Sequence, residues 1–146
     1  MTILSPRKSS ALTAVPTFDQ MLEKVRYEGA YPTRRQAEKV VHSVLEALGR
    51  QLTGDERVEL AARLPREAAA LLASQIPATR PVTGWGFVKD LAERTGGRPA
   101  ATRWDTGVAL GVVARIAGDD LVTRIVRQLP DGYALLFGRA QLLRAA

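Results

Sequence analysis

The sequence contains no cysteine, and this absence removes several chemistries at once. Disulfide bonds, thiolate nucleophiles and cysteine-ligated metal sites all require a residue that the chain does not have. Aromatic residues make up only 5% of the chain, and long runs of β-branched or aromatic residues are missing. Strands favour those residues, whereas the Ala and Leu that dominate here lead the helix-propensity ranking. The composition therefore predicts an all-α protein.

Long apolar runs are missing as well. No segment approaches the ~20 consecutive apolar residues that a membrane-spanning helix needs. The first ten residues mix Ser, Pro, Arg and Lys with single apolar residues, and so lack the apolar core of a signal peptide. We therefore expect a cytoplasmic protein that has no membrane partner.

The charge is unbalanced but evenly spread. The 146 residues carry a formal net charge of +6, with 25% charged and 46% hydrophobic residues, which is typical of one globular domain. A basic domain raises the question of nucleic-acid binding. Residues 1–80 and 81–146 each carry a net charge of +3, however, and no polybasic arm follows Arg7 and Lys8. We favour a solvated basic surface and keep nucleic-acid binding as an alternative.

Helical spacing of the apolar residues predicts about eight helices in two repeats of a four-helix unit. Residues 1–15 have no periodicity and are expected to form a flexible tail before a single domain over residues 16–146. The first repeat covers residues 17–76, a proline-containing linker covers residues 77–83, and the second repeat covers residues 84–144. The two repeats are expected to pack as one compact bundle, because a short helical unit buries too little surface alone.

Cap residues set the expected helix boundaries. A Thr followed three residues later by Gln or Glu is a capping box, and this pattern begins at Thr17, Thr33 and Thr53. Pro65 suits the first turn of the fourth helix, and Thr102 is expected to cap the sixth.

The evidence for the repeat is a set of matching motifs. In each pair the first member belongs to the first half: Phe18-x-x-x-Leu22 and Phe87-x-x-x-Leu91, Gly54-Asp-Glu and Gly118-Asp-Asp, Leu64-Pro65 and Leu129-Pro130.

This order of motifs, given twice around a long Ala/Val/Leu helix, resembles a bacterial family known as domain of unknown function 2267. The resemblance covers about residues 17–143. It implies an all-helical duplicated fold in a bacterial, actinobacterial cytoplasm, and it implies no reaction and no ligand. Gly107 and Gly111 interrupt the long helix of the second half, so the two halves are not equivalent. The two glycines would allow another helix to approach closely. We favour close packing within the domain, and a homodimer is the minority interpretation.

Candidate catalytic and metal-binding residues are sparse. His42 is the only histidine. The adjacent Ser43 points elsewhere on the helix, and Glu38 and Glu46 are ordinary helix-surface partners, so the sequence supplies no nucleophile and no orienting group for a base. The acidic pairs Asp55-Glu56 and Asp119-Asp120 stand where helices begin, so favourable interaction with the helix dipole explains them better than a metal does. We expect neither an enzyme nor a cofactor or metal site.

Two sets of residues remain as binding candidates. Arginines near helix starts and a glycine loop could hold an anion, namely Arg34, Arg35, Arg94, Arg98 and Arg103. Aromatic side chains at the edges of the second half could line a groove for a partner protein, namely Trp85, Tyr133 and Phe137. Of the two, the sequence favours a non-enzymatic protein-interaction module, with nucleic-acid binding through the arginines as the alternative.

Overall fold

The computed structural model describes residues 14–139, and every regular element in that range is a helix. The expected all-α class and compact bundle are confirmed. The helices are α2 (Phe18–Gly29), α3 (Arg34–Gly49), α4 (Gly54–Arg63), α5 (Arg66–Ala73), α6 (Gly84–Thr95), α7 (Pro99–Ala117), α8 (Asp119–Gln128) and α9 (Tyr133–Leu136). Most of the predicted tail, residues 1–13, lies outside the described residues. None of the described helices is long and apolar enough to cross a membrane.

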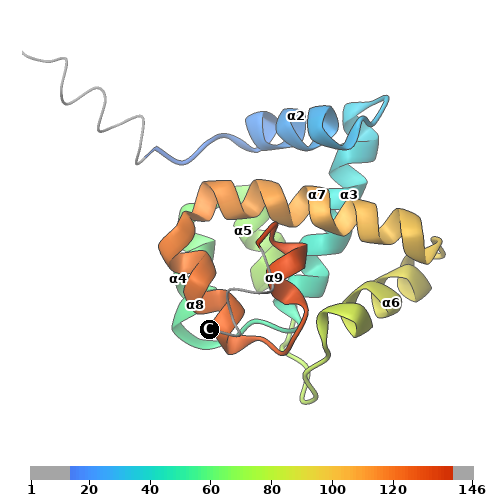
Figure 1. The fold of residues 1–146 in the computed structure, drawn as a ribbon. Coiled ribbons are helices and arrows are strands. Elements are labelled where there is room, and N and C mark those ends of the chain that lie inside the picture. The colour runs from blue at the N-terminus through green and yellow to red at the C-terminus, as the bar shows by residue number, and fades with distance from the viewer. Residues whose placement is uncertain (1–13, 140–146) are drawn as a thin grey trace, which may run out of the picture.

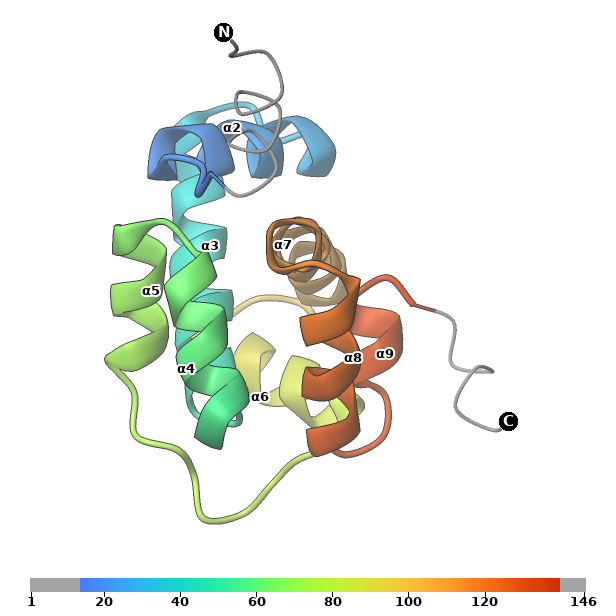
Figure 2. The same cartoon turned by 90° about the vertical axis from the view of Figure 1, so that its left-hand side faces the viewer.

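Two helices organise the bundle. The long helices α3 and α7 pack against each other, and each also contacts α2 and α6 (Figure 1). Figure 2 shows α3, α4 and α5 on one side of the molecule, α7, α8 and α9 on the other, and α2 above them. The buried side chains form one cluster to which every helix contributes. The expected apolar stripe of α3 supplies Val41, Val44, Leu45 and Leu48 to this cluster.

Threonine caps are present at two of the three predicted positions, and they fix the starts of α2 and α3. The Thr17 hydroxyl accepts a hydrogen bond of 3.0 Å from the Gln20 amide, and the Gln20 side chain accepts one of 2.9 Å from the Thr17 amide. This reciprocal pair is a complete capping box. At α3, the Thr33 hydroxyl accepts a hydrogen bond from the Gln36 amide at 3.2 Å.

The third predicted capping box, at Thr53, is wrong. The Thr53 side chain caps no helix. Its amide donates to the Gln128 side-chain oxygen at 2.8 Å, and the Gln128 side-chain nitrogen donates back to the Thr53 carbonyl at 2.9 Å. A contact between α4 and α8, residues far apart in the chain, has replaced the local cap.

The predicted start of the sixth helix at Thr102 is also wrong. Helix α7 begins at Pro99, with Arg98 at the cap position, and Thr102 is buried inside the helix. Proline suits a first helical position because its φ is already helical and that position needs no amide donor. The two alanines after Pro99 then extend the helix.

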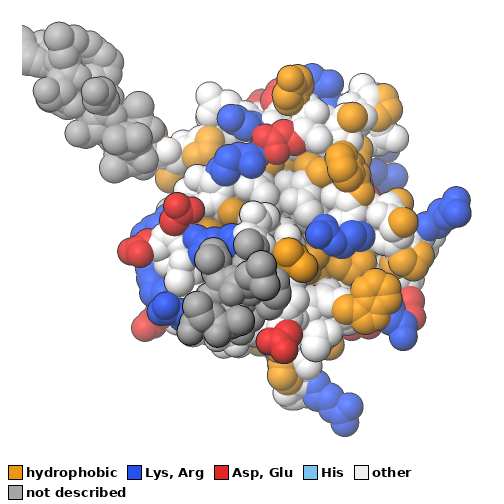
Figure 3. Space-filling model, in the orientation of Figure 1, with side chains coloured by type: hydrophobic (Ala, Val, Ile, Leu, Met, Phe, Trp, Pro, Cys, Tyr) orange, Lys and Arg blue, Asp and Glu red, His pale blue; other side chains and the backbone are white. Residues whose placement is uncertain are grey.

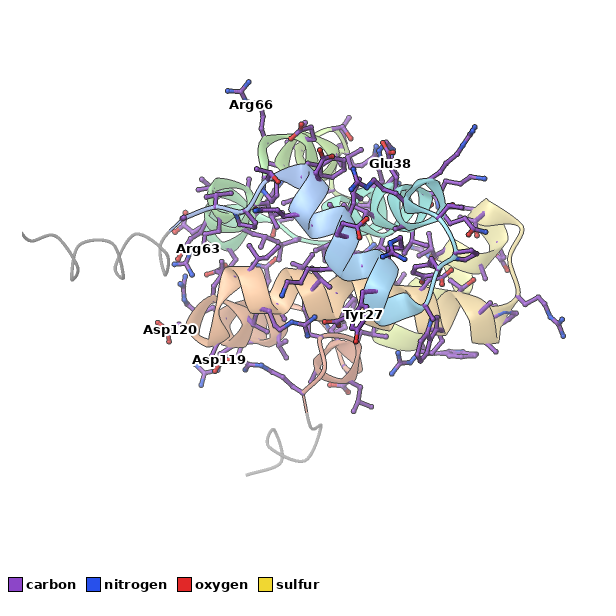
Figure 4. All side chains as sticks on the ribbon, turned by 90° about the horizontal axis from the view of Figure 1, so that it is seen from above. Tyr27, Glu38, Arg63, Arg66, Asp119 and Asp120 are labelled. Carbon is purple, nitrogen blue, oxygen red and sulfur yellow. The ribbon has the colours of Figure 1, made fainter. Side chains whose placement is uncertain are left out.

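A charged seam joins the two sides of the bundle between α4 and α8. Both terminal nitrogens of Arg124 donate to the Glu59 carboxylate at 2.8 Å, and this pairing lowers the pKa of Glu59 below its usual range. Arg63 donates to the Ala117 carbonyl at 2.5 Å, so it closes the end of α7 (Figure 4). Matching helices of the two halves thus meet here, although the duplication itself stays a prediction.

The Arg57 side chain, on α4, joins the carboxyl ends of α3 and α5. Its guanidinium donates to the backbone carbonyls of Gly49, Leu52, Leu72 and Gln75. The last carbonyls of a helix have no partner within the helix, and one arginine supplies partners to the ends of both α3 and α5. This arrangement fixes the turn from α3 into α4 against the end of α5.

Helix α6 begins where two glycines bring their backbones together. A Cβ on Gly84 would lie 2.6 Å from the carbonyl carbon of Gly132. The Gly84 amide donates to the backbone carbonyl of Asp131 at 2.7 Å. We expect Gly84→Ala to lower the free energy of unfolding by about 1–3 kcal/mol, because backbone must move to admit the methyl group.

Gly111→Ala is the matched control for that substitution. No atom lies within 4 Å of a Cβ added at Gly111, so this change should raise stability by about 0.5–1 kcal/mol through helix propensity. Urea unfolding of both variants measures the two effects. Equal stability of the two variants would contradict the close approach at Gly84.

Candidate partner-binding groove

A hollow of the described chain lies between α2 and α7. It has a volume of about 810 Å³, is open to solvent, and follows the side of α2 that faces the second half of α7. Figure 4 shows α2 crossing over α7, with Tyr27 at the crossing. The apolar lining consists of Pro16, Met21, Tyr27, Val112 and Ile116. Helix α2 packs at one end of α3 and crosses α7, and the groove lies beside this crossing.

Charged side chains surround the apolar lining. Arg34, at the start of α3, pairs with Asp19 at 3.5 Å and with Glu23 at 3.3 Å. The pKa of Glu23 is lowered because Arg26 donates to its carboxylate and Arg34 adds a second positive charge. In Figure 3, acidic and basic side chains lie side by side over α2, next to hydrophobic ones. These pairs belong to the exposed surface, so each contributes little to stability.

One ion pair crosses the groove and one cation on its rim stays unpaired. Arg115 of α7 binds the Glu28 carboxylate of α2. Lys24, also on α2, is exposed and forms no ion pair with any described residue. The Tyr27 side chain is 81% exposed. The groove therefore offers apolar contact area together with one free positive charge.

Two hydrogen bonds anchor the far end of α2 to α7. The Tyr31 hydroxyl donates to Asp105 at 2.5 Å, and the Trp104 indole donates to the Gly29 carbonyl at 3.2 Å. Burial raises the pKa of Tyr31 above its ordinary value, and the hydrogen bond to Asp105 raises it further. These two hydrogen bonds tie the carboxyl end of α2 to α7, and residues from both halves of α2 line the groove.

The comparison with protein families matches the stretch of sequence that contains these helices. The model of the family DUF2267, described as an uncharacterized conserved protein, matches residues 18–136, from the first residue of α2 to the last of α9. The chain belongs to DUF2267. No curated protein matches it.

Two of the three aromatic residues expected to contact a partner are core residues in this DUF2267 chain. Tyr133 is fully buried and Phe137 nearly so, and the Tyr133 ring packs edge-on against Phe87 with centroids 5.5 Å apart. The Tyr133 hydroxyl donates to the Val82 carbonyl at 3.0 Å. The interpretation of Tyr133 and Phe137 as contact residues is therefore wrong. Trp85 alone remains available, with 68% of its surface exposed.

The five arginines expected to bind anions do not form one site. Arg34 is neutralised on the rim of the groove, and Arg35, next to it, is exposed. Arg94 lines a different pocket, between α3 and α6. Arg98 is the cap residue of α7, and Arg103 is exposed on the same helix beside Gly107. Residues lining the groove, such as Lys24 and Arg115, were not expected, because their proximity depends on how α2 crosses α7.

The remaining polar candidates occupy ordinary helix positions. His42 is exposed, and its Nε2 lies 3.6 Å from the carboxylate of Glu38, one turn earlier. Within residues 14–139, no group of three or more His, Asp or Glu side chains is arranged to hold a metal ion. The first turns of α4 and α8 contain the acidic pairs Asp55, Glu56, Asp119 and Asp120.

The raised pKa of Tyr31 predicts a loss of stability at alkaline pH. Above pH ~10 the unfolded chain releases this proton while the folded chain keeps it, so the free energy of unfolding falls as pH rises. We expect Tyr31→Phe to make the fall between pH 9 and 11 shallower. Equal slopes for the wild type and Tyr31→Phe would contradict the assigned environment.

Proposed function

We propose that this DUF2267 domain is a non-enzymatic interaction module that binds an amphipathic helix of a partner protein between α2 and α7. The observation that carries the proposal is the groove of about 810 Å³, with its apolar lining and its unpaired Lys24. An amphipathic helix laid into an apolar groove is a common mode of peptide recognition.

The shape of the groove supports a helical occupant. Its walls are two helices of 12 and 19 residues, and a third helix can pack its side-chain ridges into the space between two others. The exposed side chains of Lys24 and Tyr27 on the groove can adjust their rotamers to an occupant. Adjustments of side chains are common when partners bind.

Charge supports an acidic residue on the occupant. The three carboxylates that line the groove belong to Asp19, Glu23 and Glu28, and all of them already bind arginines. Lys24 is the cation without an acidic partner in this part of the described chain. A carboxylate beside the apolar face of the incoming helix would pair with it, and such pairs contribute mainly to specificity and register.

The surroundings of the single histidine favour binding over acid–base catalysis. A general base needs the group it deprotonates within hydrogen-bond distance. His42 lies next to Glu38 on the exposed side of α3, away from the lining of the groove.

The test is a selection of displayed 16-residue helical peptides on the wild-type protein, followed by affinity measurement on charge-reversed variants. We expect the selected peptides to be amphipathic and to contain an acidic residue. Lys24→Glu should weaken their affinity for the protein by about tenfold, because it replaces attraction between charges with repulsion. Lys89→Glu makes the same change on the exposed surface of α6 and should leave affinity unchanged. Peptides that bind both variants equally would overturn the proposal.

Nucleic-acid binding is the alternative, and the net charge of +6 is the observation in its favour. Six arginines are already engaged, because acidic side chains of the same chain bind Arg26, Arg34, Arg63, Arg115, Arg124 and Arg139. The short helix α4 packs against α5 and α8, so it does not stand free to enter a groove of DNA.

A salt series with mixed-sequence duplex DNA decides between the two functions. For an interaction module we expect dissociation constants no tighter than the ~10⁻⁴ M of weak non-specific binding at physiological salt. A micromolar affinity that falls steeply with salt would mean that arginines neutralise phosphates, and would place the alternative first.

A further inference from the structure

A small pocket at the opposite end of α3 gathers three arginines. It lies between the end of α3, the segment that joins α5 to α6, and α6 itself, and it has a volume of about 120 Å³. Arg50 comes from the end of α3, Arg80 from the joining segment, and Arg94 from α6. This volume is well below the ~300–1,000 Å³ of sites for drug-sized molecules, so it suits one small charged group.

The positive charge of this pocket is only partly neutralised within the described chain. None of the three arginines forms an ion pair with a described residue, and Asp90 is the one carboxylate that lines the pocket. The pKa of Arg50 is lowered by burial and by the positive charge of Arg94, while Glu46 and Asp90 act in the opposite direction with less effect. Cations held near one another without an anion between them repel.

Two backbone contacts hold the wall that carries Arg80. The Ala78 amide donates to the Arg50 carbonyl at 2.7 Å, and the Val82 amide donates to the Gln51 side-chain oxygen at 3.2 Å. Arg80 lies between these two fixed points, and prolines on both sides restrict the backbone further. Its position over the end of α3 is therefore set by the fold, although its side chain is exposed.

The helix end beneath the pocket does not oppose an anion strongly. The carboxyl end of a helix carries partial negative charge on its free carbonyls. Here Arg57 binds the carbonyls of Gly49 and Leu52, and Ala78 binds that of Arg50. The Arg50 guanidinium is itself oriented by a hydrogen bond of 2.9 Å to the Gln75 side chain.

We propose that this pocket binds a phosphate group, either free phosphate or the phosphate of a small phosphomonoester, between Arg50, Arg80 and Arg94. Guanidinium groups match phosphate oxygens with paired N–H donors, and a dianion neutralises the excess charge of the three arginines. The site is independent of the groove between α2 and α7, so either proposal can fail without the other.

The test is a nuclear magnetic resonance titration of the full chain with sodium phosphate, against sodium chloride at equal ionic strength. We expect saturable shifts of backbone amides at Gln51, Ala78 and Leu91, and tighter binding at pH 7.5 than at pH 5.5, where phosphate carries less charge. A parallel titration with glycerol 3-phosphate distinguishes the sources. Equal or tighter binding of the ester identifies a phosphomonoester site, and binding of inorganic phosphate alone identifies a free-phosphate site.

The double variant Arg80→Gln/Arg94→Gln should weaken phosphate binding by at least about tenfold. Both side chains are exposed and neither forms a hydrogen bond in the described chain, so the variant should fold. Arg66→Gln/Arg127→Gln makes the same charge change on exposed positions of α5 and α8, and should bind like the wild type (Figure 4 shows Arg66 pointing away from the molecule).

Asp90→Asn gives a second, opposite prediction, because removal of the carboxylate in the pocket should tighten phosphate binding. No saturable shift beyond that of chloride would overturn the proposal. Unchanged affinity in Arg80→Gln/Arg94→Gln would overturn it as well.

Discussion

The contact on which the rest of this structure depends is the Arg57 guanidinium among four backbone carbonyls. The ends of α3 and α5 meet there, and the free carbonyls of two helix ends would otherwise repel one another in a partly buried place. A guanidinium has five N–H donors in one plane and no acceptor, so a single side chain can serve several carbonyls at once. Lysine could not, because its three donors leave from one nitrogen atom. The turn from α3 to α4, and with it the position of α4 against α8, follows from this one contact.

The groove follows from a second constraint, which is the way α2 is attached. Helix α2 packs through one apolar face on α3 and α7. Polar contacts fasten both of its halves, because Arg34 of α3 pairs with Asp19 and Glu23, and hydrogen bonds of Tyr31 and Trp104 hold the carboxyl end. The groove lies on the side of α2 that faces the second half of α7.

Local patterns predicted the helices well because helix formation is governed by spacing and by caps within a few residues. The apolar stripe of α3 and the capping box at Thr17 needed no information from elsewhere in the chain. The predictions failed where a distant partner intervened. Thr53 binds Gln128 instead of its own helix, and Tyr133 is buried because Phe87 and Val82 are beside it. No spacing rule shows that Arg57 meets four carbonyls, or that Arg50, Arg80 and Arg94 share a pocket, since each set is assembled from separate segments.

The arginines illustrate why net charge is a poor guide to the partners of this chain. Some, such as Arg124, bind acidic side chains between helices, and Arg57 replaces missing carbonyl partners. Those side chains already have partners within the protein, so they offer no free positive charge to a ligand. Lys24 on the groove, together with Arg80 and Arg94 at the pocket, has no such partner in the described chain. The two proposed sites use cations that folding leaves unpaired, one beside apolar surface and the others in a small pocket lined by three arginines. The two environments favour different ligands, because apolar surface dominates the lining of the first, whereas three arginines line the second.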